Sequence, residues 1–82
     1  RVPNLRVYLA RRGAALRSGS PFEAGDIVTW DLGNGRDHTG IVSDRRTADG
    51  RRPLVIHNLG PVCREEDALR AWRITGHYRL SR

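Results

Sequence analysis

The hydrophobic positions along the chain change from helical spacing to the alternation of β-strands near residue 24. Leu5, Tyr8 and Leu9 recur at intervals of three and four residues, which places them on one face of a helix. This spacing predicts a helix over Asn4–Arg12, and the glycine that follows is a typical stop signal. The residues Ala14–Glu23 contain serine, glycine and proline and are predicted to form a connector.

Beyond the connector, four segments combine β-branched or aromatic residues with alternating apolar and polar positions. Gly33-Asn34-Gly35 joins the first two, and a longer polar loop joins the second to the third, so both connections are typical of hairpins. Acidic residues favour a turn or two of helix within Arg64–Trp72, before the last segment. The predicted strands are Asp26–Asp31, His38–Ser43, Leu54–Asn58 and Ile74–Leu80, the last at an edge of the sheet.

These elements predict an α+β fold, with one N-terminal helix followed by a four-stranded, mainly antiparallel sheet. A chain of 82 residues forms at most one domain. A domain of this size buries only about 60% of the surface that it exposes when unfolded. The sequence begins at Arg1 and contains no methionine, from which we expect residues 1–82 to be a single partial domain of a longer protein.

Two histidines are predicted to meet on the sheet. Side chains alternate along a strand, so His38 and Gly40 share a face of the second strand. If Ser43 pairs with Leu54 in the third strand, Gly40 lies opposite His57 and His38 is a diagonal neighbour, within reach of a long side chain. A shift of the register by two residues places the histidines directly opposite each other, and only a one-residue shift separates them to different faces. Gly40 leaves room for the rings or for a substrate. In such a pair one imidazole can act as a base that takes a proton from a nucleophile, while the other fixes the tautomer of the first.

Two other interpretations of the histidine pair stay open at this point. A hydrogen-bonded pair of histidines at the end of a sheet often has a structural role only. A zinc site needs further ligands, and the neighbouring carboxylate, Asp37, points to the opposite face from His38. We therefore expect no metal and no cofactor.

The net charge of +6 comes from fifteen arginines without any lysine. A basic surface attracts phosphate. These arginines are scattered, however, and do not form one stripe with interleaved aromatic residues, so we expect no nucleic-acid partner. The longest apolar run, Leu54–Ile56, is far shorter than the roughly 20 residues needed to cross a bilayer, so we expect no membrane span.

Three motifs in this order resemble the NlpC-type branch of the papain-like cysteine peptidases and amidases, and the CHAP amidases share the first two. The motifs are Gly25-Asp26-Ile27-Val28, His38-Thr39-Gly40-Ile41-Val42 and Val55-Ile56-His57-Asn58. Over nearly the whole chain the sequence is similar to a bacterial group, domain-of-unknown-function family 1287. That similarity includes Val2-Pro3-Asn4-Leu5, Arg52-Pro53-Leu54 and the ending Ile74-Thr75-Gly76-His77-Tyr78-Arg79.

The resemblance implies the β half of a papain-like fold, in which His38 is the general base and His57 orients it. It also implies hydrolysis of amide bonds in peptidoglycan stem peptides or related N-acyl substrates by a periplasmic or secreted protein. Asn58 is the reserve candidate for the orienting role, and Asp26 is expected to fix the turn before its strand. The residues expected to support the site or bind substrate are Asp26, Trp30, Gly40 and Asn58.

The nucleophilic cysteine of that family precedes this segment, at the start of a helix whose dipole lowers the thiol pKa. The chain contains only Cys63, which follows both histidines. We therefore expect a missing N-terminal lobe to supply the thiolate, and Cys63 to be an ordinary thiol. The alternatives are a non-catalytic module that binds cell-wall peptides or a protein, and the toxin domain of an antibacterial effector, covered by an immunity or inhibitor protein.

Overall fold

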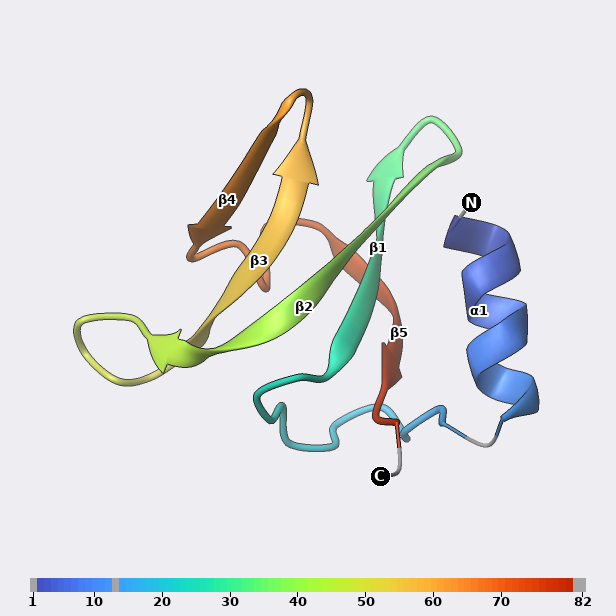
Figure 1. Cartoon of the computed structure of the whole chain (residues 1–82), viewed down its shortest axis with the longest axis horizontal. Coiled ribbons are helices and arrows are strands. Elements are labelled where there is room, and N and C mark those ends of the chain that lie inside the picture. The colour runs from blue at the N-terminus through green and yellow to red at the C-terminus, as the bar shows by residue number, and fades with distance from the viewer. Residues whose placement is uncertain (1, 13, 81–82) are drawn as a thin grey trace.

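Figure 1 shows the computed structural model of the chain, which describes residues 2–12 and 14–80. Within these residues one helix, α1 (Val2–Arg11), precedes five strands. The strands form an antiparallel sheet in the order β4-β3-β2-β1-β5. The α+β class is confirmed, whereas the prediction of four strands is wrong. The strands are β1 (Ile27–Gly33), β2 (Arg36–Arg46), β3 (Pro53–Leu59), β4 (Val62–Glu66) and β5 (Arg73–Tyr78).

The predicted helix is confirmed, and it lies beside β2 and β5 (Figure 1). Leu9 is buried in a cluster with Tyr78, and Leu5 and Ile27 pack against this cluster. Tyr8 was expected on the same buried face, but 55% of its surface is exposed. The apolar stripe of α1 is therefore narrower than its sequence suggests. No helix in the described part of the chain is long and apolar enough to cross a membrane.

The face of the sheet opposite α1 carries the larger apolar core, and we call it the histidine face because it also carries His38 and His57. Trp30 pairs directly with His38 across β1 and β2, so the two side chains leave the sheet on the same side. The segment that follows β4 covers this face. The buried members of the core are Val28, Trp30, Val42, Val55, Ala68 and Leu69.

The predicted hairpin between β1 and β2 is confirmed. Gly33, Asn34 and Gly35 have φ angles of 94°, 54° and 71°, a region that glycine and asparagine tolerate best. β2 continues beyond the expected end of its strand to Arg46, so the loop to β3 is shorter than predicted. In the longer β2, side chains still alternate between the two faces around His38, so His38 and Gly40 share a face as expected.

The segment predicted to be helical, Arg64–Trp72, instead begins within a strand. β4 pairs with β3 along its whole length. The acidic residues that favoured a helix make contacts across the sheet: Glu65 accepts a hydrogen bond from Ser43, and Glu66 lies against His57. Strand pairing at the open edge of β3 has thus outweighed the local charge pattern.

β5 lies at an edge of the sheet, as predicted. Its pairing with β1 shifts between Thr29 and Trp30, so the regular alternation expected along this strand is interrupted. His77 lies opposite Val28 and is buried, with 6% of its surface exposed. It is therefore a packed side chain and not a solvated one.

Candidate catalytic site

His38 and His57 meet at the end of the β2–β3 ladder. The ladder pairs Gly40 with His57, which is the register that makes His38 a diagonal neighbour, and His38 lies two residues before Gly40 on the same face of β2. The two rings approach edge to face with centroids 5.1 Å apart. Nε2 of His38 lies 2.9 Å from Nδ1 of His57, a normal hydrogen-bond distance. The expected diagonal contact is formed.

The two rings differ in exposure. The side chain of His57 is fully buried, with 0% exposed, whereas His38 is half-buried. Burial, and secondly the neighbouring His57, lower the pKa of His38 from its ordinary 6.5, because both disfavour the charged ring. Nδ1 of His38 makes no hydrogen bond to a side chain of the described residues. A neutral imidazole with one uncommitted nitrogen has the chemistry of a general base.

Two tryptophans frame the histidine rings. Trp30 is buried and stacks on His38 with centroids 5.5 Å apart, and Trp72 lies edge-on to both histidines at 5.7 and 5.8 Å. Nε1 of Trp30 donates a hydrogen bond of 2.9 Å to the carbonyl oxygen of Leu69. The Trp30 ring also fills the space above Gly40, which was expected to be open for the histidines or a substrate. The frame restricts His38 to few orientations, as a catalytic base requires.

Glu66 extends the pair on the far side of His57. Its Oε2 lies 2.7 Å from Nε2 of His57. Glu66 lies opposite Val55 in the β3–β4 ladder and is therefore on the histidine face. The sequence prediction missed Glu66 because it assigned residues 64–72 to a helix. Alternation through Val62–Glu66, read as a strand beside β3, is the signal that would have placed it near His57.

Cys63 lies on β4 but belongs to the opposite face of the sheet. Arg64 is the residue opposite His57, and Cys63 is opposite Asn58. Because side chains alternate, neither Cys63 nor Asn58 projects from the histidine face. Residues 62–66 form a strand, so Cys63 does not lie at the start of a helix, where a dipole would favour the thiolate. Asn58, the reserve candidate for orienting His38, is not in position to do so.

Asp26 anchors the start of β1 and lies away from the histidine pair. Its buried carboxylate accepts a 2.9 Å hydrogen bond from the backbone N–H of Glu23 and 2.8 Å hydrogen bonds from Arg79. It also lies 2.6 Å from Nε2 of His77. Burial raises the pKa of Asp26, but the hydrogen bonds from Arg79, Glu23 and His77 together outweigh it and lower the pKa to about 2. Asp26 thus occupies the turn-fixing position expected for it.

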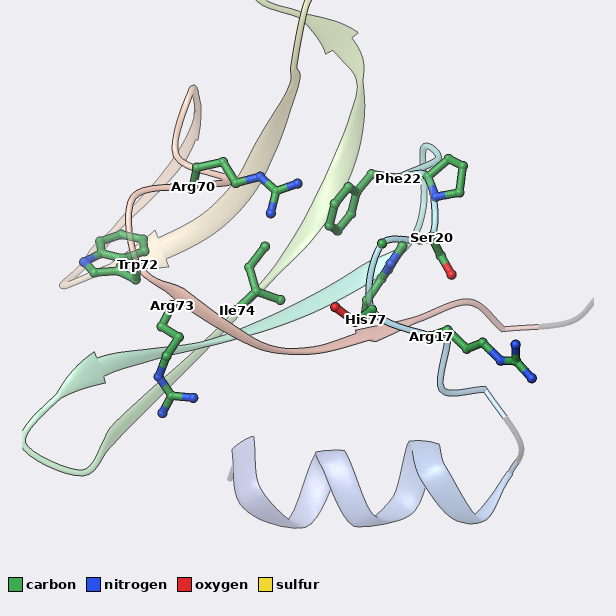
Figure 2. Close-up of a pocket in the computed structure, with 11 residues that line it drawn as sticks. Arg17, Ser20, Phe22, Arg70, Trp72, Arg73, Ile74 and His77 are labelled. Atoms are coloured by element: carbon green, nitrogen blue, oxygen red, sulfur yellow. The ribbon is translucent and has the colours of Figure 1, made fainter.

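Two cavities flank the site. The smaller, of about 330 Å³, is lined by both histidines and also by residues whose side chains belong to the opposite face of the sheet, namely Thr39, Ile41, Ile56, Asn58 and Cys63. The larger, of about 630 Å³, lies between the connector before β1 and the chain leading into β5, with Trp72 in its wall (Figure 2). Arg70 extends over this larger cavity, with its guanidinium carbon 5.3 Å from the centre of the Phe22 ring. Arg17 and Arg73 point away from it (Figure 2).

The residues described contain no group of three histidine, cysteine or acidic side chains that could hold a metal ion. Asp37, on the strand next to His38, accepts a hydrogen bond of 3.5 Å from Arg6 of α1. It faces the helix and is not available to the histidine pair.

Comparison with known proteins places the chain in a family. The family described as "Domain of unknown function (DUF1287)" matches residues 1–80. The chain is 49% identical over 82 residues to a protein of Escherichia coli (strain K12) named "Uncharacterized protein YijF"; the match covers 96% of this chain and 40% of that protein. No solved structure is significantly similar to the chain. The chain belongs to the DUF1287 family.

Proposed function

We propose that this chain is the β-sheet lobe of an NlpC-type cysteine hydrolase that cleaves amide bonds in peptidoglycan or related peptides. The observation that carries the proposal is the 2.9 Å hydrogen bond between Nε2 of His38 and Nδ1 of His57. It leaves Nδ1 of His38 uncommitted, on a ring whose pKa is lowered, as a general base needs. The resemblance of the His38 and His57 motifs to the NlpC branch supplies the reaction class.

In the proposed reaction the nucleophilic cysteine comes from outside these 82 residues, because Cys63 belongs to the other face. His38 takes the proton of that thiol. The thiolate attacks the substrate carbonyl, the C–N bond breaks, and His38 returns the proton to the leaving amine. Water, deprotonated by His38, then attacks the thioester, which releases the acid and regenerates the thiol. His57 holds the ring of His38 through both proton transfers.

The larger cavity supports a peptide as the substrate. It shares Trp72 with the histidine frame, and Phe22 and Ile74 add apolar walls. Arg70 has no carboxylate partner among the described residues and lies over this cavity (Figure 2). Arginine matches the planar shape of a carboxylate, so a peptide with a free carboxylate suits the cavity. Peptidoglycan stem peptides are of this kind, and we propose a periplasmic or secreted location for the protein.

A binding module that holds cell-wall peptides without cleaving them is the second candidate. It is favoured by the size of the larger cavity, about 630 Å³ against about 330 Å³ beside the histidines. The two functions differ in their need for His38. Cleavage requires its imidazole, whereas binding beside Phe22 and Arg70 does not.

The test uses the full-length protein that contains this chain and purified muropeptides, with the products identified by mass spectrometry. We expect new cleavage products from the wild type, none from His38→Ala, and a reduced rate from His57→Ala. Circular dichroism would check that both variants are folded. Muropeptide binding without any cleavage by the wild type would reject the hydrolase and favour the binding module.

A further inference from the structure

Glu66 is hydrogen-bonded to the buried histidine His57. Its carboxylate oxygen lies 2.7 Å from Nε2 of His57, whose side chain is fully buried, while 40% of the Glu66 side chain remains exposed. The adjacent Glu65 faces the other side of the sheet and bonds to Ser43. Two neighbouring acids on β4 therefore serve different faces, and only Glu66 is connected to the candidate catalytic pair.

Because Glu66 accepts hydrogen bonds, it determines which atom is the donor in both the Glu66–His57 and the His57–His38 hydrogen bond. An ionised carboxylate only accepts hydrogen bonds, so Nε2 of His57 carries a proton. In the neutral ring Nδ1 of His57 is then an acceptor. Nε2 of His38, 2.9 Å away, must donate to it. Neutral His38 consequently has its proton on Nε2 and its lone pair on Nδ1.

We propose that Glu66 is a positioning residue for the hydrolysis: through His57 it sets the tautomer of His38 and makes Nδ1 of His38 the basic nitrogen. The catalytic part of this inference rests on the proposed function, but the tautomers do not. When Nδ1 of His38 takes a proton, the imidazolium donates from Nε2 toward His57, and the Glu66 charge stabilises it through that ring. A buried aspartate behind a catalytic histidine has this orienting effect in serine proteases.

Loss of the carboxylate has a defined consequence. Without an acceptor at Glu66, His57 is no longer held as the Nε2–H tautomer, and its Nδ1 can carry the proton instead. That proton faces Nε2 of His38, which must then accept it. The proton of His38 moves to Nδ1, where it blocks the base. Replacement of Glu66 by Gln keeps an acceptor oxygen, so the tautomers persist while the charge is lost.

The test reads the tautomers directly, by long-range ¹H–¹⁵N correlation of the imidazole rings in the ¹⁵N-labelled full-length protein at about pH 8, where histidine is neutral. We expect Nε2–H for both His38 and His57 in the wild type, in Glu66→Gln and in the control Glu65→Gln. Glu66→Ala should show mixed tautomers at both rings. Wild-type His57 with its proton on Nδ1, or unchanged tautomers in Glu66→Ala, would overturn the inference.

Kinetics with muropeptides provide the second measurement. Because Glu66 acts through His57 and does not touch the substrate, Glu66→Ala should lower kcat by about tenfold or more with little change in KM. Glu66→Gln should lose less, and Glu65→Gln should match the wild type. Equal kcat in Glu66→Ala and the wild type would overturn the positioning role. A wild type that shows the expected tautomers but no hydrolysis would instead reject the proposed function and leave the tautomer assignment intact.

Discussion

The indole ring of Trp30 lies directly over the backbone of Gly40. A Cβ at residue 40 would lie 2.8 Å from Cη2 and 3.0 Å from Cζ3 of Trp30, and 3.0 Å from the carbonyl oxygen of Ile56. The missing side chain therefore lets Trp30 cross β2 and stack on His38 with centroids 5.5 Å apart. The glycine of the His-x-Gly motif makes room for the aromatic support of the histidine.

Replacement of Gly40 by Ala should destabilise the protein by about 1–3 kcal/mol, the usual cost of forcing an extra methyl group into a packed site. The Trp30 ring is fully buried and packs against His38 and Trp72, so it cannot move away from a new methyl group without losing these contacts. Urea unfolding of the full-length protein measures this change. The double variant Gly40→Ala with Trp30→Phe removes the clashing atoms of the indole ring, though not the carbonyl oxygen of Ile56, so its cost should be less than the sum of the two single costs. Simple additivity would show that the contact is not responsible.

Asp26 should make the fold sensitive to acid. Its pKa of about 2 in the folded protein lies below the ordinary value of 3.8, so the unfolded chain binds a proton first as the pH falls. The stability contribution is complete above about pH 4 and is lost as the pH falls toward 2. Asp26→Asn should cost about 2 kcal/mol at neutral pH, and the difference from the wild type should shrink below pH 4.

The control for this measurement is Asp44→Asn, since Asp44 is exposed at the end of β2. Its unfolding free energy should stay within about 0.5 kcal/mol of the wild type. A constant difference between Asp26→Asn and the wild type from pH 7 to pH 2 would contradict the assignment of the effect to ionisation.

Cys63→Ser should leave muropeptide hydrolysis unchanged, because Cys63 projects from the face opposite the histidines. Alkylation with iodoacetamide should still inhibit this variant, since the proposed nucleophile lies elsewhere in the protein. Rates measured before and after alkylation check both statements. A folded Cys63→Ser variant without activity would identify Cys63 as the nucleophile and reject the proposed arrangement.

Arg70→Gln should weaken the binding of a peptide with a free carboxylate by about tenfold, the effect of one charge-assisted hydrogen bond. In turnover, KM should rise while kcat stays nearly constant, because Arg70 lines the larger cavity, whose walls include neither His38 nor His57. Calorimetric titration with an acetylated tripeptide and with its C-terminal amide checks the role of the charge.

Arg51→Gln is the matched control for Arg70, since it removes one charge from the exposed loop between β2 and β3. It should bind the tripeptide as the wild type does. An equal loss in both variants would indicate general electrostatic attraction and not a site at Arg70. Equal affinity of the wild type for the acid and the amide would exclude carboxylate recognition.

Several features of this fold followed from local rules. The spacing of Leu5 and Leu9 predicted the helix, and Gly33-Asn34-Gly35 predicted the first hairpin, because each depends on backbone preferences over a few residues. The segment Arg64–Trp72 was predicted wrongly for the complementary reason. Its acidic residues suit a helix start when taken alone, whereas its strand forms only beside β3.

The sequence by itself determined that His38 and His57 share a face, because alternation along a strand and a hairpin register leave few other arrangements. Only the tertiary structure decided which groups surround them. Glu66 reaches His57 because β4 pairs with the open edge of β3. Trp72 reaches the histidines because its segment packs against the buried Trp30. Such contacts join residues distant along the chain, and their free energy is gained only when the whole sheet is packed.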